Sequence, residues 1–258
     1  MDLNLKGKSV LITGASKGIG LAAAEAFAEE GCDLHLAARS EDLLAAHARR
    51  LEDAHRIRVS VHPADLRRSA DVDRLADACG DIDVLVNNAG DIPQGTLGDI
   101  DEERWRHAWD LKVFGFINLT RRIYAGMKAR GGGVIINDIG AAGERFDFNY
   151  LAGSTGNAAL MAFTRALGGR SLMNDNIRVV GINPGPVETD RMVNRLQENA
   201  RAKWGDETRW RELTAAFPLG RAAKPREIAD LMAFLASDRS GYTTGVICTV
   251  DGGWSARN

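Results

Sequence analysis

TGASKGIG, at Thr13–Gly20, is the most informative stretch of this 258-residue chain. It closes a short apolar run, Ser9–Thr13, and precedes an alanine-rich segment, Leu21–Glu29, that favours a helix. We therefore expect a strand that passes through a tight turn into a helix. The glycines of this stretch permit such a turn, since glycine reaches backbone conformations that other residues avoid.

The same alternation of apolar runs and helical patterns continues along the chain. Further apolar runs lie at Asp33–Ala38, Val59–His62, Val84–Asn87, Gly133–Asn137, Val179–Asn183 and Val246–Val250. Continuously apolar strands are typical of sheets covered on both faces. Seven strands separated by helices predict an α/β fold with a parallel, doubly wound sheet. Right-handed crossovers then bring the carboxyl ends of the strands to one edge, where ligands bind.

The composition excludes several classes of partner. Hydrophobic residues make up 45% and charged residues 26%, the net charge is −2, and the basic residues are scattered. Neither nucleic acid nor a membrane surface is expected as a partner. The chain starts without a long apolar leader and no segment reaches membrane-spanning length, which favours a cytoplasmic location. We expect one domain over residues 1–258, with the polar segment 188–217 forming an inserted helical flap.

The cysteines give no sign of a metal site. Cys32, Cys79 and Cys248 are widely spaced and form no Cys-x-x-Cys pair. This pattern argues against a disulfide framework or a zinc site. We expect three reduced core residues and no bound metal.

The glycine-rich turn also predicts a phosphate site. Glycines let the backbone approach a pyrophosphate, which the first N–H groups and the positive dipole end of the following helix would bind. Taken alone, three glycines fit an ordinary strand-to-helix turn equally well. Other motifs, spread along the whole chain, favour the phosphate site.

Five ordered motifs make nearly the whole chain resemble the short-chain dehydrogenase/reductase family. They are TGASKGIG at 13–20, Asp65-Leu66, NNAG at 87–90, NPGPVETD at 183–190 and VDGG at 250–253. The resemblance implies a Rossmann-type three-layer sandwich that binds a dinucleotide. The cofactor-binding residues that it implies are Gly14, Ser16, Lys17, Gly18, Ile19, Gly20, Arg39, Asp65, Leu66, Asn88, Ala89, Gly90, Pro184, Gly185, Val187 and Thr189.

The end of the second strand indicates which dinucleotide is preferred. It reads Ala38-Arg39-Ser40 and lacks the acidic residue that would bind a free ribose 2′-hydroxyl. Arg39 and Lys17 can instead reach a 2′-phosphate. We expect NADP(H) in preference to NAD(H), the alternative being that both side chains are solvated surface charges.

Members of this family use a Tyr to exchange the substrate proton, a Lys that lowers the Tyr pKa, a Ser that polarises the oxygen and an Asn that orders a water. Alignment of GVIINDIG places Gly140 at the Ser position, and the loop length places Gly153 at the Tyr position. Asn157 then stands at the Lys position and Lys112 at the Asn position. The resemblance therefore implies an atypical member with Lys and Asn exchanged and both hydroxyls missing.

Alternatives remain open at each of these positions. Lys112 would be either a relay group or an ordinary solvated lysine. Tyr150 would be either a substitute proton donor, through a three-residue slip, or a pocket-lining aromatic. Ser154 would either hold a substrate oxygen or be a plain polar residue in the first helical turn.

Three functions compete at this point. The leading one is an NADP(H)-dependent oxidoreductase acting on a carbonyl or alcohol with a rearranged proton relay. The others are a catalytically silent NADP(H)-binding sensor or partner subunit, and a lyase or isomerase. Loss of general acid–base assistance costs about 10² to 10⁴ in rate, so an active enzyme needs a substitute donor.

The substrate and the assembly are less well specified. Arg145, Phe146 and Phe148 lie in a loop at the ligand-binding edge, where specificity commonly resides. The C-terminal region from Pro218 onward resembles the oligomer-forming region of the family. The resemblance therefore implies a homotetramer or homodimer.

Overall fold

The computed structural model, which describes residues 1–256, contains one parallel sheet with strand order β3-β2-β1-β4-β5-β6-β7. The strands are β1 Ser9–Thr13, β2 Asp33–Ala38, β3 Val59–Pro63, β4 Val84–Asn87, β5 Gly133–Asp138, β6 Ile177–Pro184 and β7 Ile247–Val250. The helices are α1 Gly18–Glu29, α2 Glu41–His55, α3 Ser69–Cys79, α4 Glu102–Trp109, α5 Gly115–Arg130, α6 Leu151–Asp175, α7 Asp190–Trp204 and α8 Pro225–Ala236. The predicted α/β sandwich with seven parallel strands is confirmed.

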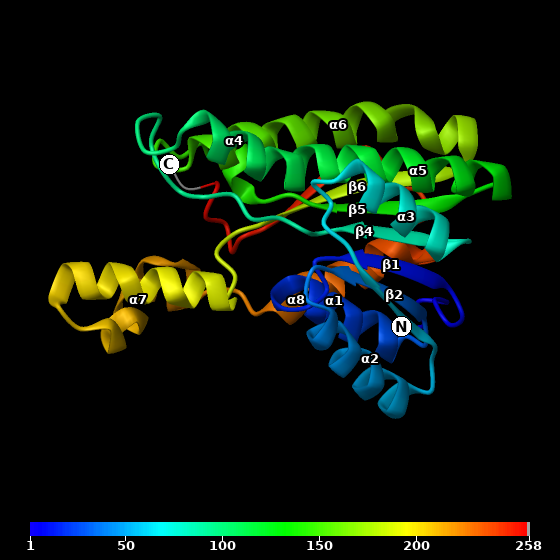
Figure 1. The fold of residues 1–258 in the computed structure, drawn as a ribbon, viewed down its shortest axis with the longest axis horizontal. Coiled ribbons are helices and arrows are strands. Elements are labelled where there is room, and N and C mark those ends of the chain that lie inside the picture. The colour runs from blue at the N-terminus through cyan, green and yellow to red at the C-terminus, as the bar shows by residue number, and fades with distance from the viewer. Residues whose placement is uncertain (257–258) are drawn as a thin grey trace.

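Helices cover both faces of the sheet. Figure 1 shows α1, α2 and α8 below it and α3, α5 and α6 above it. Alternate strand residues supply the two cores: Ile12 packs with the α1 and α8 side, whereas Leu11 packs with the α3 and α5 side. This two-sided burial explains why the strands are apolar throughout instead of alternating with polar residues.

Several element boundaries differ from the prediction, two of them by more than one residue. Helix α1 begins at Gly18 and not at Leu21, because the Leu21 N–H already bonds the Lys17 carbonyl and closes a helical turn over the glycines. Strand β6 begins at Ile177, since Gly133 and Ile177 are already in register at the start of the β5–β6 pairing. The glycine-rich stretch therefore supplies the first turn of the helix as well as the loop.

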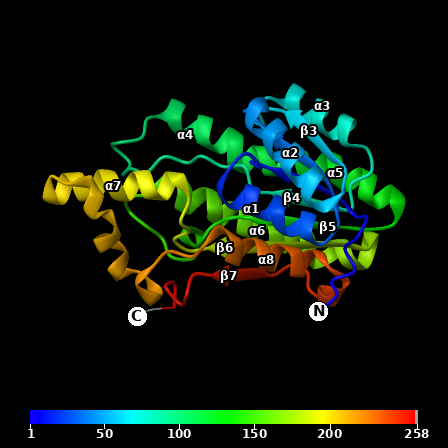
Figure 2. The same ribbon diagram turned by 90° about the horizontal axis from the view of Figure 1, so that it is seen from below.

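The segment after β6 forms a separate helical layer. Helix α7 and a 3₁₀ segment, Glu207–Ala216, pack on each other around their own apolar cluster of Met192, Leu196, Ala200, Trp210 and Ala222. Figures 1 and 2 both show α7 projecting from the sheet on the side where α4 also lies. This side is the carboxyl edge, because α7 follows the end of β6.

Cys32 and Cys79 are buried free thiols, as expected. Cys248 is wrongly predicted as a core residue: it is only partly buried, because it lies on β7 at an edge of the sheet. Among residues 1–256, no helix combines the length and apolarity that a bilayer crossing requires.

Candidate functional site

The turn between β1 and α1 is shaped to accept a phosphate group. Gly14 and Gly18 have φ angles of 68° and 60°, a left-handed backbone that favours glycine. A Cβ at position 20 would lie 2.4 Å from the Gly14 carbonyl oxygen, so this position also excludes a side chain. Lys17 precedes α1, and within residues 1–256 no side chain caps this helix end. The first N–H groups of α1 are therefore free of side-chain partners and fit an anionic ligand.

The NNAG segment after β4 is fastened to this turn. The Thr13 hydroxyl accepts hydrogen bonds from the Asn88 and Ala89 N–H groups at 2.9 and 3.1 Å. The Asn88 side-chain amide donates to the Thr13 carbonyl at 2.7 Å. A Cβ at Gly90 would lie 2.9 Å from Cδ of Lys112, so the NNAG segment also forms one wall against that lysine.

The segment after β6 closes the opposite side of the turn. A Cβ at Gly18 would lie 3.2 Å from Cγ2 of Thr189, which places Thr189 against the glycine turn. Gly185 lies against Asp251 of the VDGG motif. A Cβ at position 185 would lie 2.6 Å from the Asp251 Cβ. Val187 is buried, and Pro184 ends β6. The structure thus brings together the three backbone segments that the sequence assigned to one ligand.

Charged groups gather where β2 and β3 end. Asp65 forms an ion pair with Arg67, whose Nε donates to Oδ1 at 2.8 Å. The hydrogen bond from Arg67 lowers the pKa of Asp65, and the charge of Arg39 acts in the same direction. Arg39 and Lys17 are exposed and carry their charges at this end of the sheet. Leu66 is buried and packs against Gly115. Arg67 was not singled out from the sequence; its spacing of two residues from Asp65 is the only sequence signal for it.

Two further positions of the glycine turn have structural partners. The Ser16 carbonyl oxygen is 3.1 Å from Nε2 of His47, which ties the turn to α2. Ile19 packs against the apolar core on the α1 and α8 side of the sheet. The turn is thereby held from the side opposite to the NNAG segment.

Lys112 lies in a π-helical turn, Asp110–Phe114, between α4 and α5. Its ammonium donates a hydrogen bond to the Ile139 carbonyl at 2.5 Å. Burial lowers the pKa of Lys112 to about 8, and the charge of Arg191 acts in the same direction, while Asp138 opposes it. The structure therefore excludes the alternative that Lys112 is a freely solvated lysine.

Asp138 is a site residue that the sequence reasoning missed. It is the last residue of β5, and it is 6% exposed. Burial raises the pKa of its carboxyl to about 7, while the charge of Lys112 acts against this rise. Its Oδ1 has no hydrogen-bond partner within residues 1–256. An acidic residue at the end of an otherwise apolar strand was the available signal.

Asn157 lies opposite Lys112 across the same exit of β5. Its amide Nδ2 donates to the Gly140 carbonyl at 3.3 Å, directly after the Ile139 carbonyl that Lys112 holds. A Cβ at Gly140, where φ is 127°, would lie 2.9 Å from that amide nitrogen. The Asn157 Oδ1 is buried and lacks a partner in the described part of the chain. Lys112 and Asn157 thus bind the carbonyls of two consecutive residues, Ile139 and Gly140.

Tyr150 occupies the volume that a side chain at position 153 would need. A Cβ at Gly153 would lie 2.0 Å from Cε1 and 2.1 Å from Cζ of the Tyr150 ring. The ring packs beside Ile92, Ala152 and Trp105. Burial raises the pKa of Tyr150, and the charges of nearby arginines oppose the rise. The Tyr150 phenol ring therefore fills the space beside Gly153 that a side chain at this position would need.

The surrounding loops place several arginines around this region. Arg191 of α7 donates to the Gly90 carbonyl at 2.9 Å and pairs with Asp91 at 3.2 Å. Arg195 is half-buried, and this burial lowers its pKa. The nearby Tyr150 phenol acts in the opposite direction and raises the Arg195 pKa. Helix α7 is thus connected directly to the NNAG segment.

The loop after β5 has defined contacts as well. Ser154 is buried, and its hydroxyl accepts a hydrogen bond from the Asp147 N–H at 3.1 Å, which holds this loop. The Arg145 guanidinium lies over the Trp254 ring at 5.0 Å. Phe146 and Phe148 are 75% and 71% exposed, and therefore available to a ligand.

Comparison with known proteins agrees with this geometry. A family profile described as Enoyl-(Acyl carrier protein) reductase matches residues 14–255. A 2-keto-3-deoxy-L-fuconate dehydrogenase of Xanthomonas campestris is 35% identical over 258 residues, which cover 98% of this chain and 82% of that protein. A 3-oxoacyl-(acyl carrier protein) reductase of Chlamydia muridarum is 34% identical over 260 residues, covering 98% and 99%. The crystal structure of L-sorbose reductase from Gluconobacter frateurii, complexed with NADPH and L-sorbose, has a TM-score of 0.92 at 36% identity and covers 98% of each chain.

The fold, the glycine turn and these relatives define a nucleotide-dependent oxidoreductase. The chain belongs to the short-chain dehydrogenase/reductase family.

Proposed function

We propose that this protein is an NADP(H)-dependent oxidoreductase that interconverts a carbonyl and an alcohol through a proton relay centred on Lys112. The observation that carries the proposal is the placement of a partly buried Lys112 near the buried Asp138 at the exit of β5. Their pKa values of about 8 and about 7 both lie close to neutral pH. A general acid or base works best when its pKa is near the working pH.

The choice of NADP(H) rests on charge at the end of β2. The position directly after that strand holds Arg39 and not an acidic residue that would repel a phosphate. Lys17 is exposed in the glycine turn. A guanidinium can bind phosphate oxygens through two parallel hydrogen bonds. The similar L-sorbose reductase is itself complexed with NADPH. When bound, the nicotinamide of such a cofactor supplies or accepts the hydride.

The protein's own residues would move the proton. During reduction, the Lys112 ammonium donates its proton to the substrate oxygen, and during oxidation the neutral amine accepts it. Asp138, buried beside Lys112, is placed to return or take up that proton because its carboxyl also titrates near neutrality. The unpartnered Asn157 Oδ1 is available to orient a water or a substrate hydroxyl beside the amine.

The Tyr150 ring would act as a wall of this pocket and as a second candidate donor. Its phenol occupies the space of residue 153, and because burial raises its pKa, it would be protonated at neutral pH and would release its proton less readily than Lys112. Ser154 would position the loop that carries Phe146 and Phe148, since its hydroxyl bonds that loop. In this proposal Lys112 is the proton-transfer group, and Tyr150 shapes the substrate pocket.

The substrate side would be formed by the flap at about residues 188–217, which belongs to a single domain spanning 1–258. Arg195 has no carboxylate partner within ion-pair distance in residues 1–256, and it lies beside the Tyr150 phenol. A half-buried guanidinium without a partner favours a substrate that carries an anionic group. We place the catalytic unit in a homodimer or homotetramer, as the C-terminal motifs imply.

The decisive experiment combines binding and turnover. Calorimetry with NADPH and NADP⁺ measures the cofactor site, and the NADPH absorbance reports redox turnover on a panel of carbonyls and alcohols. Cofactor-linked turnover supports the proposal. Tight NADPH binding without any turnover would make the protein a silent binder, and substrate conversion with unchanged NADPH would make it a lyase or isomerase.

A further inference from the structure

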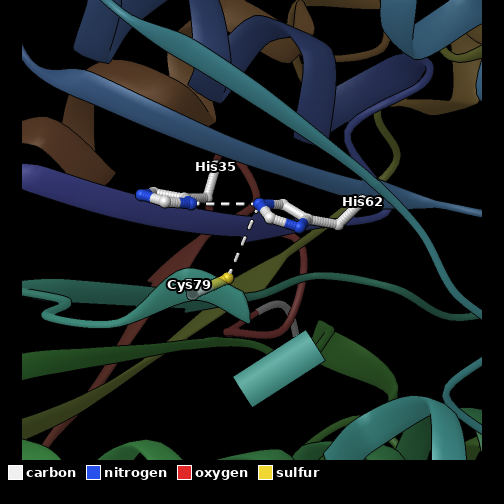
Figure 3. A group of neighbouring side chains, drawn as sticks. All are labelled: His35, His62 and Cys79. Carbon is white, nitrogen blue, oxygen red and sulfur yellow. Dashed lines mark hydrogen bonds between the residues drawn. The ribbon is translucent and has the colours of Figure 1, made fainter. Parts of the chain in front are cut away.

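His35, His62 and Cys79 meet on the face of the sheet that α3 covers (Figure 3). His35 comes from β2, His62 from β3 and Cys79 from the end of α3. His62 is in register with Ala37, two residues after His35 on the neighbouring strand, so both imidazoles project from the same face. The fold thereby assembles a group that the sequence spacing did not reveal.

The three side chains converge on one point. Nδ1 of His35 lies 3.0 Å from Nε2 of His62, and Sγ of Cys79 lies 3.7 Å from the same Nε2 (Figure 3). All three ligand atoms lie within 4.8 Å of one another. Zinc–nitrogen bonds of about 2.0–2.1 Å and zinc–sulfur bonds of about 2.3 Å separate ligand atoms by about 3.3–3.6 Å in a tetrahedron. The two separations from His62 Nε2, 3.0 and 3.7 Å, are within a few tenths of an ångström of these values.

The chemical state of the group suits a borderline-soft cation. Burial lowers the pKa of His35 and brings that of His62 to about 4, so both imidazoles are neutral at neutral pH and each has one ring nitrogen that can bind a metal ion. Burial raises the pKa of the Cys79 thiol to about 12, which keeps it protonated until a metal ion replaces the proton. Both histidines remain partly exposed, which leaves an entry path for an ion.

We propose that His35, His62 and Cys79 bind one zinc ion through two imidazole nitrogens and one thiolate, with water as the fourth ligand. Nitrogen and sulfur donors in a tetrahedral arrangement are the ligand set that zinc prefers. On binding, the Cys79 thiol loses its proton to solvent and the sulfur gains the bond to zinc. The histidine that donates the hydrogen bond between the two rings moves that hydrogen to its other ring nitrogen, so neither histidine changes its charge.

The position of the site assigns it a structural role. The ion would connect two strands of the sheet to α3, and β3 leads within three residues to Asp65, which the family resemblance assigns to the cofactor site. Strand β3 lies at one edge of the sheet and, of the strands described, pairs only with β2. Zinc would therefore fasten the outer strand and the start of the Asp65 loop, independently of the proton relay at Lys112.

A cobalt titration tests the proposal, because cobalt(II) replaces zinc and gives visible bands when it is tetrahedral and a near-ultraviolet charge-transfer band when thiolate is a ligand. The full-length protein is freed of metal by a chelator, kept reduced with a phosphine, and titrated with Co²⁺ alone. We expect both signals to saturate at one equivalent, and Zn²⁺ to remove them. The melting temperature measured with Zn²⁺ should be higher than without it.

Three variants identify the ligands. Cys79→Ser should abolish the charge-transfer band, and His62→Ala should weaken cobalt binding at least about tenfold, as expected for disturbance of a metal site. Cys248→Ser removes a thiol outside the cluster and should change neither signal. Circular dichroism establishes that each variant is folded.

The proposal is overturned if folded wild-type protein gives no cobalt bands at one equivalent. It is equally overturned if the bands persist in Cys79→Ser and His62→Ala, or if they disappear in Cys248→Ser. In the first case the cluster is held by hydrogen bonds alone.

Discussion

Replacing Lys112 by methionine removes the ammonium while retaining most of the side chain's volume. The Lys112 methylenes pack against Gly90, and a methionine can keep that contact. What is lost is the hydrogen bond to the Ile139 carbonyl and the proton that we propose is transferred. Lys112→Met therefore separates chemistry from cofactor binding better than a truncation to alanine would.

The expected cost in rate follows from the role assigned to the ammonium. Loss of a positioned general acid reduces kcat by about 10² to 10⁴, equivalent to about 3–5 kcal/mol of transition-state stabilisation. The effect on folding should be smaller, because the unpaired Ile139 carbonyl costs about 1–3 kcal/mol while the loss of a buried charge offsets part of this. Affinity for NADPH should change by less than about tenfold, equivalent to 1.4 kcal/mol.

Steady-state reduction of the best carbonyl in the panel, followed over a pH series, measures this effect. Since burial places the Lys112 pKa at about 8, wild-type kcat in the reducing direction should fall above that pH as the donor loses its proton. Lys112→Met should lack that decline. Lys8→Met changes an exposed lysine at the other end of β1 and serves as the control. A kcat for Lys112→Met within about threefold of wild type would refute the relay, since that is far below the loss expected for a general acid.

Four further outcomes are expected. Arg39→Glu should weaken NADPH binding at least about tenfold by repelling the 2′-phosphate, with less effect on NADH, as calorimetry would measure. Gly153→Tyr should lower the melting temperature because the new side chain overlaps the Tyr150 ring, and adding Tyr150→Ala should restore part of it. The folded-state pKa of Asp138, about 7, exceeds its ordinary 3.8, so the folded state binds more protons between these values and stability falls as pH rises through them. Asp138→Asn should flatten that dependence in urea unfolding at pH 5 and 7. Arg195→Gln should raise KM for carboxylate-bearing carbonyls more than for neutral ones.

Each of these has a clear contrary result. Equal losses of NADPH and NADH affinity in the Arg39 variant would remove the argument for a 2′-phosphate contact. A Gly153→Tyr protein as stable as wild type would mean that the Tyr150 ring moves freely out of that space. An unchanged pH profile in the Asp138 variant would show that this carboxyl is ionised when buried. Equal KM changes for both substrate types in the Arg195 variant would exclude an anion contact.

Much of the cofactor site could be predicted from residues because its signals are local. In the turn at Thr13–Gly20, Gly14 and Gly18 adopt positive φ angles, a local backbone conformation that favours glycine. The assignment of Gly140, Gly153 and Asn157 to the family's catalytic positions came from the family resemblance and stays a prediction. The meeting of Asn157 with Lys112 followed from the family resemblance, and the structure brings them to adjacent carbonyls.

Side-chain relations between distant segments could not be predicted in the same way. Asp138 looked like an ordinary strand end until packing buried it beside Lys112, which is what moves both pKa values. The Tyr150 ring enters the space of Gly153 through a rotamer choice that no spacing rule describes.

The local pattern of apolar residues and glycines thus predicted the sheet, its carboxyl edge and the glycine turn between β1 and α1, because strand burial and backbone conformation depend largely on near neighbours. The Lys112–Asp138 pair and the cluster of His35, His62 and Cys79 arose only on folding. Their members lie on different elements, and the distances among them are set by how helices pack on the sheet. Burial and charge at those positions follow from that packing, and they are what turn a dinucleotide-binding sheet into a candidate enzyme.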